Sequence, residues 1–389
     1  MKNVKPWPLL AVAALALLAG CSKKDKAEQP AELTEFRATA KIERVWTANA
    51  GGGAPKLRLG LGLATAGDAI YAAGRDGDVV ALNRANGKSL WRKDTKLKLS
   101  GGPGVGAGLV VVGASYGAVV ALDAASGEQK WKAQINSEIL AAPAVGPQLV
   151  LVRTVDGRVI ALNTADGSQA WSAEQQVPRL SLRGTTAPTL AGDLALSGFD
   201  NGRVMALSLA DGATVWDVSV APPSGRTELQ RLVDVDAGVL AADNDIFAVT
   251  FQGKAARIDR ETGQVQWSRD LSSYSGAALD AEGYYVSTSD GGLVKIGRRS
   301  GIEIWNQQVL VRRRLSAPAV LGTLVAVGDL DGYVHFFDST NGELAARTHP
   351  LGARVSTAPL VSGDLLVMMD ADGKIAALRA TPTTTAKKD

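Results

Sequence analysis

The stretch Leu149–Trp171 reads LVLVRTVDGRVIALNTADGSQAW and contains the pattern that decides the fold. Two aliphatic runs flank Asp156-Gly157, and a second polar turn at Gly167 leads to a lone tryptophan. Glycine adopts the positive φ that tight hairpin turns require. The pattern therefore predicts a first strand near Pro143, followed by strands over Leu149–Arg153, Arg158–Leu162 and Ser168–Ser172.

The same unit recurs eight times along the chain. Its marker glycines are Gly77, Gly117, Gly157, Gly202, Gly253, Gly291, Gly332 and Gly373. They are 38 to 51 residues apart, which is the period expected of propeller blades. Six of them are followed after fourteen residues by a tryptophan, and Ala346 takes that place in the seventh copy. The core spacing is fixed, and the length varies between one tryptophan and the next unit.

The third strand of each unit is apolar on both faces, as Val159 and Ile160 illustrate. A strand buried on both faces needs layers above and below it, and radially stacked blades supply them. The last copy lacks a fourth strand, while Trp46 in Lys41–Ala48 has no unit of its own. We predict an all-β, eight-bladed β-propeller of four-stranded antiparallel blades, closed by this N-terminal strand. An open solenoid is the alternative, but it leaves the two half-blades unexplained.

The recurring tryptophans raise the question of a ligand cage. Their regular placement on every fourth strand favours packing, with each ring lying against the next blade.

The N-terminus carries a processing signal. Lys2 and Lys5 precede the apolar run Leu9–Ala19, which is too short to span a bilayer. The run ends in Leu-Ala-Gly-Cys, which resembles the bacterial lipobox and predicts lipidation of Cys21. We expect a lipoprotein signal peptide over residues 1–20, a flexible tether over 21–40, the propeller over 41–380 and a polar tail over 381–389.

Composition limits the chemistry. With 46% hydrophobic and 21% charged residues, the chain is typical of a globular protein with a sizeable core. Its net charge of +3 argues against nucleic acid as a partner. One cysteine and two histidines are too few for the usual zinc sites.

Three short motifs are explained better by turns than by catalysis or ligand binding. Ser115 lies in a G-x-S-x-G match, but a strand rather than a helix follows it. The glycine-rich run at residues 104–108 also precedes a strand and offers no helix N-terminus for phosphate. The D-x-D-G turns at Asp329 and Asp370 lack the remaining calcium ligands. We predict no catalytic residues, no metal and no cofactor.

Three connections between units are longer than the others, and two of them flank the same unit. The first of this pair contains VPRLSLRGTTAP (Val177–Pro188), and the second contains RTELQRLVDVDAG (Arg226–Gly238). In a propeller both emerge on one face. Apolar residues ringed by opposite charges are typical of a protein-interaction patch. The alternative is that the leucines cap the blade and Arg183 pairs internally with an aspartate. The candidate partner-binding residues are Leu180, Leu182, Arg183, Asp234 and Asp236.

The lipobox, the tether, the eight units and the segments LSLRGTTAP and RLVDVD together resemble the BamB family. These are lipoprotein propellers of the outer-membrane β-barrel assembly machinery. The resemblance implies a non-enzymatic scaffold on the periplasmic side of the outer membrane, anchored by lipid. It also implies that the two connections dock on the POTRA domains of BamA, and it admits unfolded outer-membrane proteins as further partners.

The units also resemble those of quinoprotein dehydrogenases, which hold pyrroloquinoline quinone over a metal ion. Those enzymes are longer and use an adjacent cysteine pair, which this chain lacks. A polysaccharide-binding propeller is a third reading, but the remaining aromatic residues do not cluster in the long connections. Arg312-Arg313-Arg314 lies in another connection, where it is either a solvated charge run or a contact for an acidic surface or anionic lipid.

Overall fold

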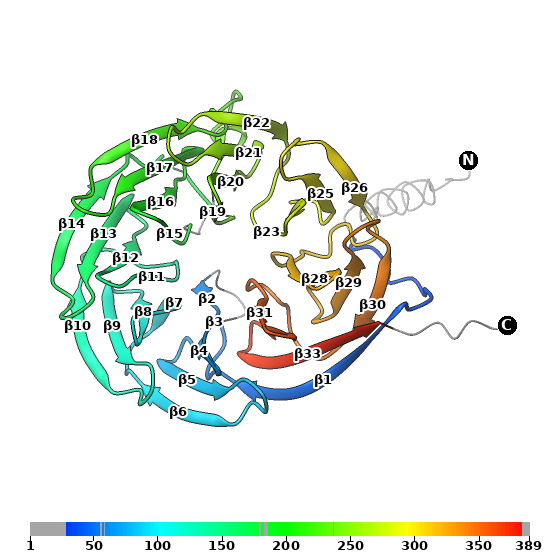
Figure 1. Cartoon of the computed structure of the whole chain (residues 1–389), viewed down its shortest axis with the longest axis horizontal. Helices are drawn as coiled ribbons and strands as arrows, with labels where there is room; N and C mark the ends of the chain where they lie inside the picture. The colour runs from blue at the N-terminus through cyan, green and yellow to red at the C-terminus, as the bar shows by residue number, and fades with distance from the viewer. Residues whose placement is uncertain are drawn as a thin grey trace, which may run out of the picture.

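The structure is a computed structural model that describes residues 29–54, 57, 59–178, 180–182, 186–235 and 237–382. Eight sheets stand around a central channel, as Figure 1 shows, and this arrangement confirms the predicted eight-bladed propeller. Each blade has four antiparallel strands, of which the first lies nearest the channel and the fourth lies on the outer rim.

The blades are numbered in chain order. Blade 1 contains β3 (Leu63–Ala66), β4 (Ala69–Ala73), β5 (Asp78–Asn83) and β6 (Ser89–Asp94), and blade 2 contains β7 (Leu99–Gly106), β8 (Leu109–Ala114), β9 (Ala118–Asp123) and β10 (Gln129–Gln134). Blade 3 contains β11 (Ala144–Val145), β12 (Leu149–Arg153), β13 (Arg158–Asn163) and β14 (Gln169–Glu174), and blade 4 contains β15 (Thr189–Ala191), β16 (Leu194–Gly198), β17 (Arg203–Ser208) and β18 (Thr214–Ser219). Blade 5 contains β19 (Leu240–Ala242), β20 (Asp245–Val249), β21 (Lys254–Asp259) and β22 (Val265–Asp270), and blade 6 contains β23 (Ala277–Leu279), β24 (Gly283–Ser287), β25 (Leu293–Gly297) and β26 (Glu303–Gln307). Blade 7 contains β27 (Ala319–Leu321), β28 (Leu324–Gly328), β29 (Val334–Asp338) and β30 (Leu344–Thr348), and blade 8 contains β31 (Leu360–Ser362), β32 (Leu365–Met369), β33 (Lys374–Pro382) and β1 (Ala40–Asn49).

The ring closes in blade 8, where strands from the two ends of the chain pair. β1 runs antiparallel to β33, with Ala40 opposite Pro382 and Trp46 opposite Ala377. The predicted closure by the N-terminal strand is therefore confirmed, and β33 continues two residues past the expected boundary at residue 380. Pairing the two ends leaves neither half-blade with an open edge inside the ring.

The hydrophobic core lies between the blades. Tyr71 and Ala73 of blade 1, for example, pack with Val110 and Val112 of blade 2 in one buried cluster. Such face-to-face packing explains why the second and third strands are apolar on both sides.

Tryptophan side chains join each blade to the next at the rim. Each indole N–H donates to a backbone carbonyl of the following blade, at 2.8 to 3.2 Å. Each ring also packs on a glycine of that blade's third turn, such as Trp171 on Gly212, whose φ is +76°. A Cβ atom on Gly212 would lie 2.6 Å from the ring, so glycine is needed there for both space and φ. The predicted packing role of the tryptophans is confirmed.

The interface between blades 7 and 8 is the exception, and Ala346 of β30 marks it. In every other blade a turn joins the third strand to the fourth, but in blade 8 these strands are β33 and β1, which come from opposite ends of the chain. The seventh blade therefore has no glycine turn on which a tryptophan could dock. Instead the chain before β1 passes beside β30, where the Thr39 N–H donates to the Ala345 carbonyl at 2.9 Å.

The chain before β1 also contacts blade 7 further upstream. The Ala31 N–H donates to the Val311 carbonyl at 3.0 Å, and Arg347 donates to the Thr34 carbonyl at 3.0 Å. The Arg347 guanidinium also lies 5.1 Å from the centre of the Phe36 ring. Residues 31–39 of the segment expected as a tether thus lie against the propeller.

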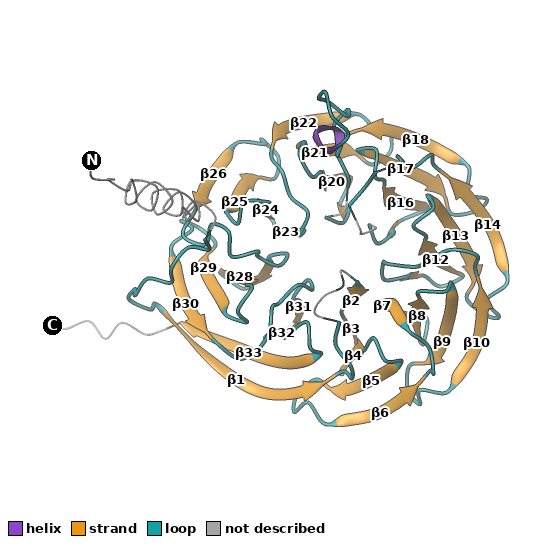
Figure 2. Ribbon diagram, turned by 180° about the vertical axis from the view of Figure 1, so that it is seen from behind, coloured by secondary structure: helices purple, strands orange, loops and turns teal. Residues whose placement is uncertain are grey.

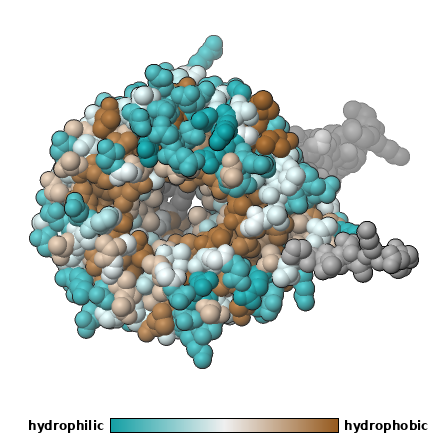
Figure 3. Space-filling view, in the orientation of Figure 1, coloured by the Kyte–Doolittle hydropathy of each residue, from teal (hydrophilic) through white to brown (hydrophobic). Residues whose placement is uncertain are grey.

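The long connection between β1 and β3 is used inside the fold. It contributes β2 (Gly60–Leu61), a short strand that pairs in parallel with β7 beside the channel. The mouth of the channel is open in Figure 3, with hydrophobic residues gathered around it. No helix among the described residues is both long enough and apolar enough to cross a membrane.

The tryptophan contact predicts a difference between two glycines with nearly equal φ. Gly108 (φ +75°) faces open space, whereas a Cβ on Gly212 would collide with Trp171. We expect Gly108→Ala to lower the free energy of unfolding by about 1 kcal/mol through its φ alone. Gly212→Ala should lower it by about 3 kcal/mol because overpacking adds to the backbone strain. Urea unfolding measures both, and equal losses would contradict the docking role of the turn.

Candidate functional site

The loops of the disc fall on two faces. The second turn of a blade joins its second strand to its third and contains the marker glycine. In blades 2, 3 and 4, a backbone N–H of the connection that leaves the blade donates to the carbonyl of this glycine, as the Gln175 N–H does to the Gly157 carbonyl at 2.9 Å. Connections between blades and second turns therefore share one face, which we call the interblade face. The first and third turns lie on the opposite face, where Arg84 donates to the Asp68 carbonyl at 2.9 Å.

Two long connections flank blade 4 on the interblade face, and a buried carboxylate joins them. The first links β14 to β15, and the second links β18 to β19. The Leu182 N–H of the first donates to the Asp234 carboxylate of the second. Asp234 is completely buried. The prediction that the two connections are spatial neighbours is therefore confirmed.

The backbone around Asp234 is held on both sides. Its carbonyl accepts from the Phe251 N–H at 2.9 Å, and the next residue, Val235, donates to the Phe199 carbonyl at 3.1 Å. Because a buried carboxylate is costly unless hydrogen bonds satisfy it, the connection that supplies the Leu182 N–H is tied to this position. Asp234 acts as an internal brace, whereas the sequence had suggested a surface charge.

A second buried charge lies beneath the first connection. The Ser181 side chain hydrogen-bonds to Asp200, a residue of the second turn of blade 4. Burial raises the pKa of Asp200, although the Arg153 guanidinium and the Ser181 hydroxyl oppose the shift. Arg153 is fully buried, 3.8 Å from the Asp200 carboxylate and 4.5 Å from the centre of the Phe199 ring. The connection thus rests on a polar base that fixes its backbone.

The second connection has a buried half and an exposed half. Leu232, Val233, Val235 and Val239 are buried. Residues 222–231 are exposed and contain η2 (Leu229–Arg231), the short helix that Figure 2 draws over blade 5. The Gln230 side chain accepts from the Arg226 N–H at 2.9 Å and so holds this helix together. The buried half anchors the connection and lets the helix project.

In the described parts of the two connections, the large hydrophobic side chains that are exposed are Leu180 and Leu229. Leu180 is 41% exposed and Leu229 is 66% exposed, whereas Leu182 is half-buried. Leu180 and Leu182 were predicted from the sequence and Leu229 was not, although its place in a long polar insertion is a signal that could have pointed to it. Arg183 and Asp236 lie outside the described residues, so their predicted roles stay predictions.

The motifs that resemble catalytic or ligand sites have structural partners. The Ser115 hydroxyl accepts from Arg75 at 2.6 Å. Of the two histidines, His335 lies in β29 of blade 7 and His349 directly follows β30. Asp329 and Asp370 accept backbone N–H groups of their own turns, at 2.9 to 3.1 Å. Among the described residues, no three acidic, histidine or cysteine side chains are grouped as a metal would need.

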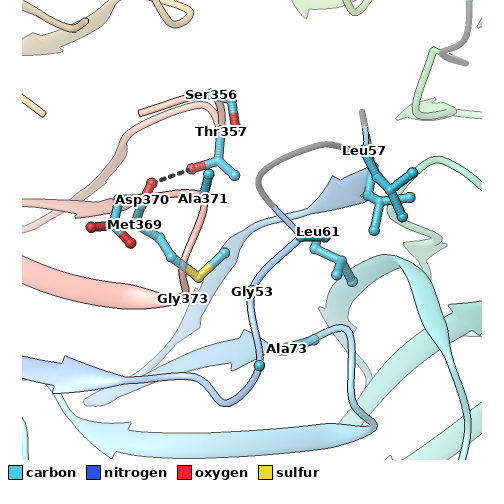
Figure 4. Close-up of a pocket in the computed structure, with 13 residues that line it drawn as sticks. Gly53, Leu57, Leu61, Ala73, Ser356, Thr357, Met369, Asp370, Ala371 and Gly373 are labelled. Atoms are coloured by element: carbon cyan, nitrogen blue, oxygen red, sulfur yellow. Dashed lines mark hydrogen bonds between the residues drawn. The ribbon is translucent and has the colours of Figure 1, made fainter. Parts of the chain in front are cut away.

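A small cavity lies where blades 8 and 1 meet, and Figure 4 shows its walls. It is lined by Leu57, Leu61 and Met369 among others, and Thr357 donates to the Met369 carbonyl at 3.1 Å. Its volume of about 40 Å³ has room for a water molecule or two, far less than ligand pockets usually provide.

Comparisons with known proteins give a consistent result. The profile of the family described as outer membrane protein assembly factor BamB matches residues 40–96, 75–307 and 290–383. The chain is 47% identical to outer membrane protein assembly factor BamB of Pseudomonas aeruginosa, over 95% of this chain and 98% of that one. It is also similar to the crystal structure of BamB from Moraxella catarrhalis, with a TM-score of 0.80, 29% identity and coverage of 87% and 100%.

A further solved structure shares the fold alone. Quinohemoprotein alcohol dehydrogenase from Comamonas testosteroni superposes with a TM-score of 0.70 at 14% identity. The overlap covers 87% of this chain and 76% of the dehydrogenase.

The brace between the two connections can be tested by hydrogen exchange. Asp234→Ala removes the acceptor of the Leu182 N–H, so we expect this amide to exchange about tenfold faster or more. Asp211→Ala is the matched control, because this exposed carboxylate accepts the Ala213 N–H in the third turn of blade 4, on the opposite face. Mass spectrometry of a peptide covering residues 180–182 measures the effect. Unchanged protection in Asp234→Ala would show that Asp234 does not hold the connection.

Proposed function

The chain belongs to the BamB family of outer membrane protein assembly factors, and from that premise we propose that it is a non-enzymatic scaffold for the assembly of β-barrel proteins into the outer membrane. A scaffold needs a rigid body and a surface that a partner can recognise. The closed ring supplies the rigid body, and the two braced connections beside blade 4 supply the surface.

We propose that this surface binds BamA through its periplasmic POTRA domains. The observation that supports this most is the hydrogen bond between the Leu182 N–H and Asp234, which brings the two connections together. Protein interfaces gain most from apolar side chains that lie on a pre-organised base and are surrounded by polar groups. Leu180 and Leu229 are such side chains, because each projects from a connection whose backbone is held by buried groups.

The proposal extends to the membrane. Lipidation of Cys21, which lies outside the described residues, would anchor the chain to the periplasmic side of the outer membrane. The partners are then BamA and the lipid surface. Unfolded outer-membrane proteins are a further candidate, and the edges that the closed ring offers them are the inner and outer strands of its blades.

Recovery of BamA tests the surface. We expect Leu182→Asp and Arg183→Glu each to reduce the amount of BamA that co-purifies from detergent-solubilised outer membranes, because a mismatched charge at a docked surface costs several-fold in affinity or more. Ile302→Asp is the matched control, since Ile302 is 62% exposed but lies just before β26 in the third turn of blade 6, on the opposite face. Undiminished recovery from both variants would remove the site assignment.

The alternative function is that of a quinone-dependent dehydrogenase, a class of enzyme that shares this fold. Among the described residues, no three acidic, histidine or cysteine side chains are grouped to hold the metal ion that such enzymes use, which argues against this function. We therefore expect the absorbance spectrum of the purified protein to equal the sum of its parts after addition of pyrroloquinoline quinone and calcium. A shifted quinone absorbance band, together with stoichiometric binding of the quinone to the protein, would favour the enzyme instead.

A further inference from the structure

The arginine triplet at residues 312–314 is divided into one buried and two exposed side chains. Arg313 is buried and donates to Asp329 at 2.7 Å, to Asp331 at 2.6 Å and to the Ala31 carbonyl at 3.0 Å. Arg312 and Arg314 are exposed. Within the part of the chain that the structure describes, neither of these two guanidinium groups has an ion pair or hydrogen bond.

The backbone of both exposed arginines is left-handed. Arg312 has φ +61° and Arg314 has φ +51°. This conformation costs free energy for any side chain with a Cβ atom, and glycine would adopt it without that cost. Backbone strain in a folded protein tends to mark functional positions. Two strained arginines on either side of Arg313 therefore indicate that the side chains themselves are needed.

The strain has a local cause that aims both side chains outward. The Arg312 N–H donates to the Asp290 carbonyl at 2.7 Å, and the Arg313 carbonyl accepts from the Leu330 N–H at 3.0 Å. With Arg313 pinned inward by two aspartates, the residues on either side must turn away from the core. The connection between blades 6 and 7 thus displays two cations to solvent.

The displayed arginines line a groove of about 720 Å³. Its other walls come from Tyr274, Asp290, Leu330 and Arg354, and from Pro30 of the chain before β1. Three arginines and one aspartate give the groove a net charge of about +2 by simple count. By this count the lining of the groove is positively charged.

We propose that Arg312 and Arg314 form a second docking site, which binds an extended acidic segment of a partner protein. The guanidinium group is suited to carboxylates because its planar fork can donate two parallel hydrogen bonds to them. Tyr274 and Leu330 provide an apolar wall against which the aliphatic parts of the segment's side chains can pack. Its carboxylates lie between the two arginines.

The location favours a protein over a lipid surface. The groove is formed by connections and second turns, so it opens on the interblade face, the same face as Leu180 and Leu229. A partner docked there excludes a flat bilayer from the whole face. This part of the argument rests on the proposed function, whereas the groove and its charge do not.

Binding of a fluorescent octaglutamate peptide to the purified full-length protein in detergent tests the proposal. At low ionic strength we expect Arg312→Glu/Arg314→Glu to weaken binding about tenfold or more, because two attractive pairs become repulsive. Lys88→Glu/Arg299→Glu is the matched control, since both residues are exposed in third turns on the opposite face and the net charge changes equally. It should bind within about twofold of the unmodified protein.

A second variant separates binding from folding. Arg312→Gly/Arg314→Gly relieves the left-handed strain, so its melting temperature should be unchanged or about 2 °C higher. It should nevertheless lose the peptide affinity. Retained affinity in this variant, or equal losses in both charge-reversal variants, would overturn the site.

A vesicle experiment covers the other source of negative charge. We expect phosphatidylglycerol, added to phosphatidylcholine vesicles, to increase binding equally for the unmodified protein and for Arg312→Glu/Arg314→Glu. A phosphatidylglycerol effect that disappears only in this variant, with octaglutamate binding intact, would make the groove a lipid site and refute the proposal. A negative peptide result leaves the BamA recovery experiment untouched, so the two proposals fail separately.

Discussion

The architecture depends on one repeated contact, in which a tryptophan ring lies on a left-handed glycine of the next blade and its indole N–H binds a carbonyl three residues earlier. The contact combines a large apolar surface with a directed hydrogen bond, so it fixes both the distance and the angle between neighbouring blades. It also explains the sequence spacing: the glycine and the tryptophan must sit at constant positions after the marker glycine, because each belongs to a different interface. Where the chain ends remove the glycine turn in blade 8, the tryptophan of blade 7 is absent as well.

This dependence is why the fold could be predicted from sequence. Constant spacing survives in the repeats, and the unmatched Trp46 indicated which strand closes the ring. Other features could not be read in this way. The parallel strand β2, the contacts of residues 31–39 with blade 7 and the reason for Ala346 all follow from which segments meet in space. None of them leaves a periodic signal, since each occurs only once.

The candidate site also has one part that the sequence predicts and one part that it does not. The residue spacing between units indicates which connections are long and that two of them flank one blade, and the structure brings those two together. Burial within the connections was not predictable, because Asp234 and Leu229 belong to insertions without a repeat to compare. A charge between two valines turned out to be the brace, and a leucine inside a polar stretch turned out to be the most exposed apolar side chain of the two connections. Local polarity alone does not distinguish a projecting helix from a buried anchor.

Two docking sites on one face have a mechanical consequence. A partner held only beside blade 4 could still rotate about that contact, whereas a second contact beside blades 6 and 7 on the same rigid ring removes the rotation. The second contact also forms at the high effective concentration created by the first, so each site can be weak without losing orientation. A weak apolar contact and a weak, salt-sensitive charged contact together give a complex that is defined in geometry yet reversible. Such a combination suits a scaffold that must hold a moving assembly machine in place without locking it.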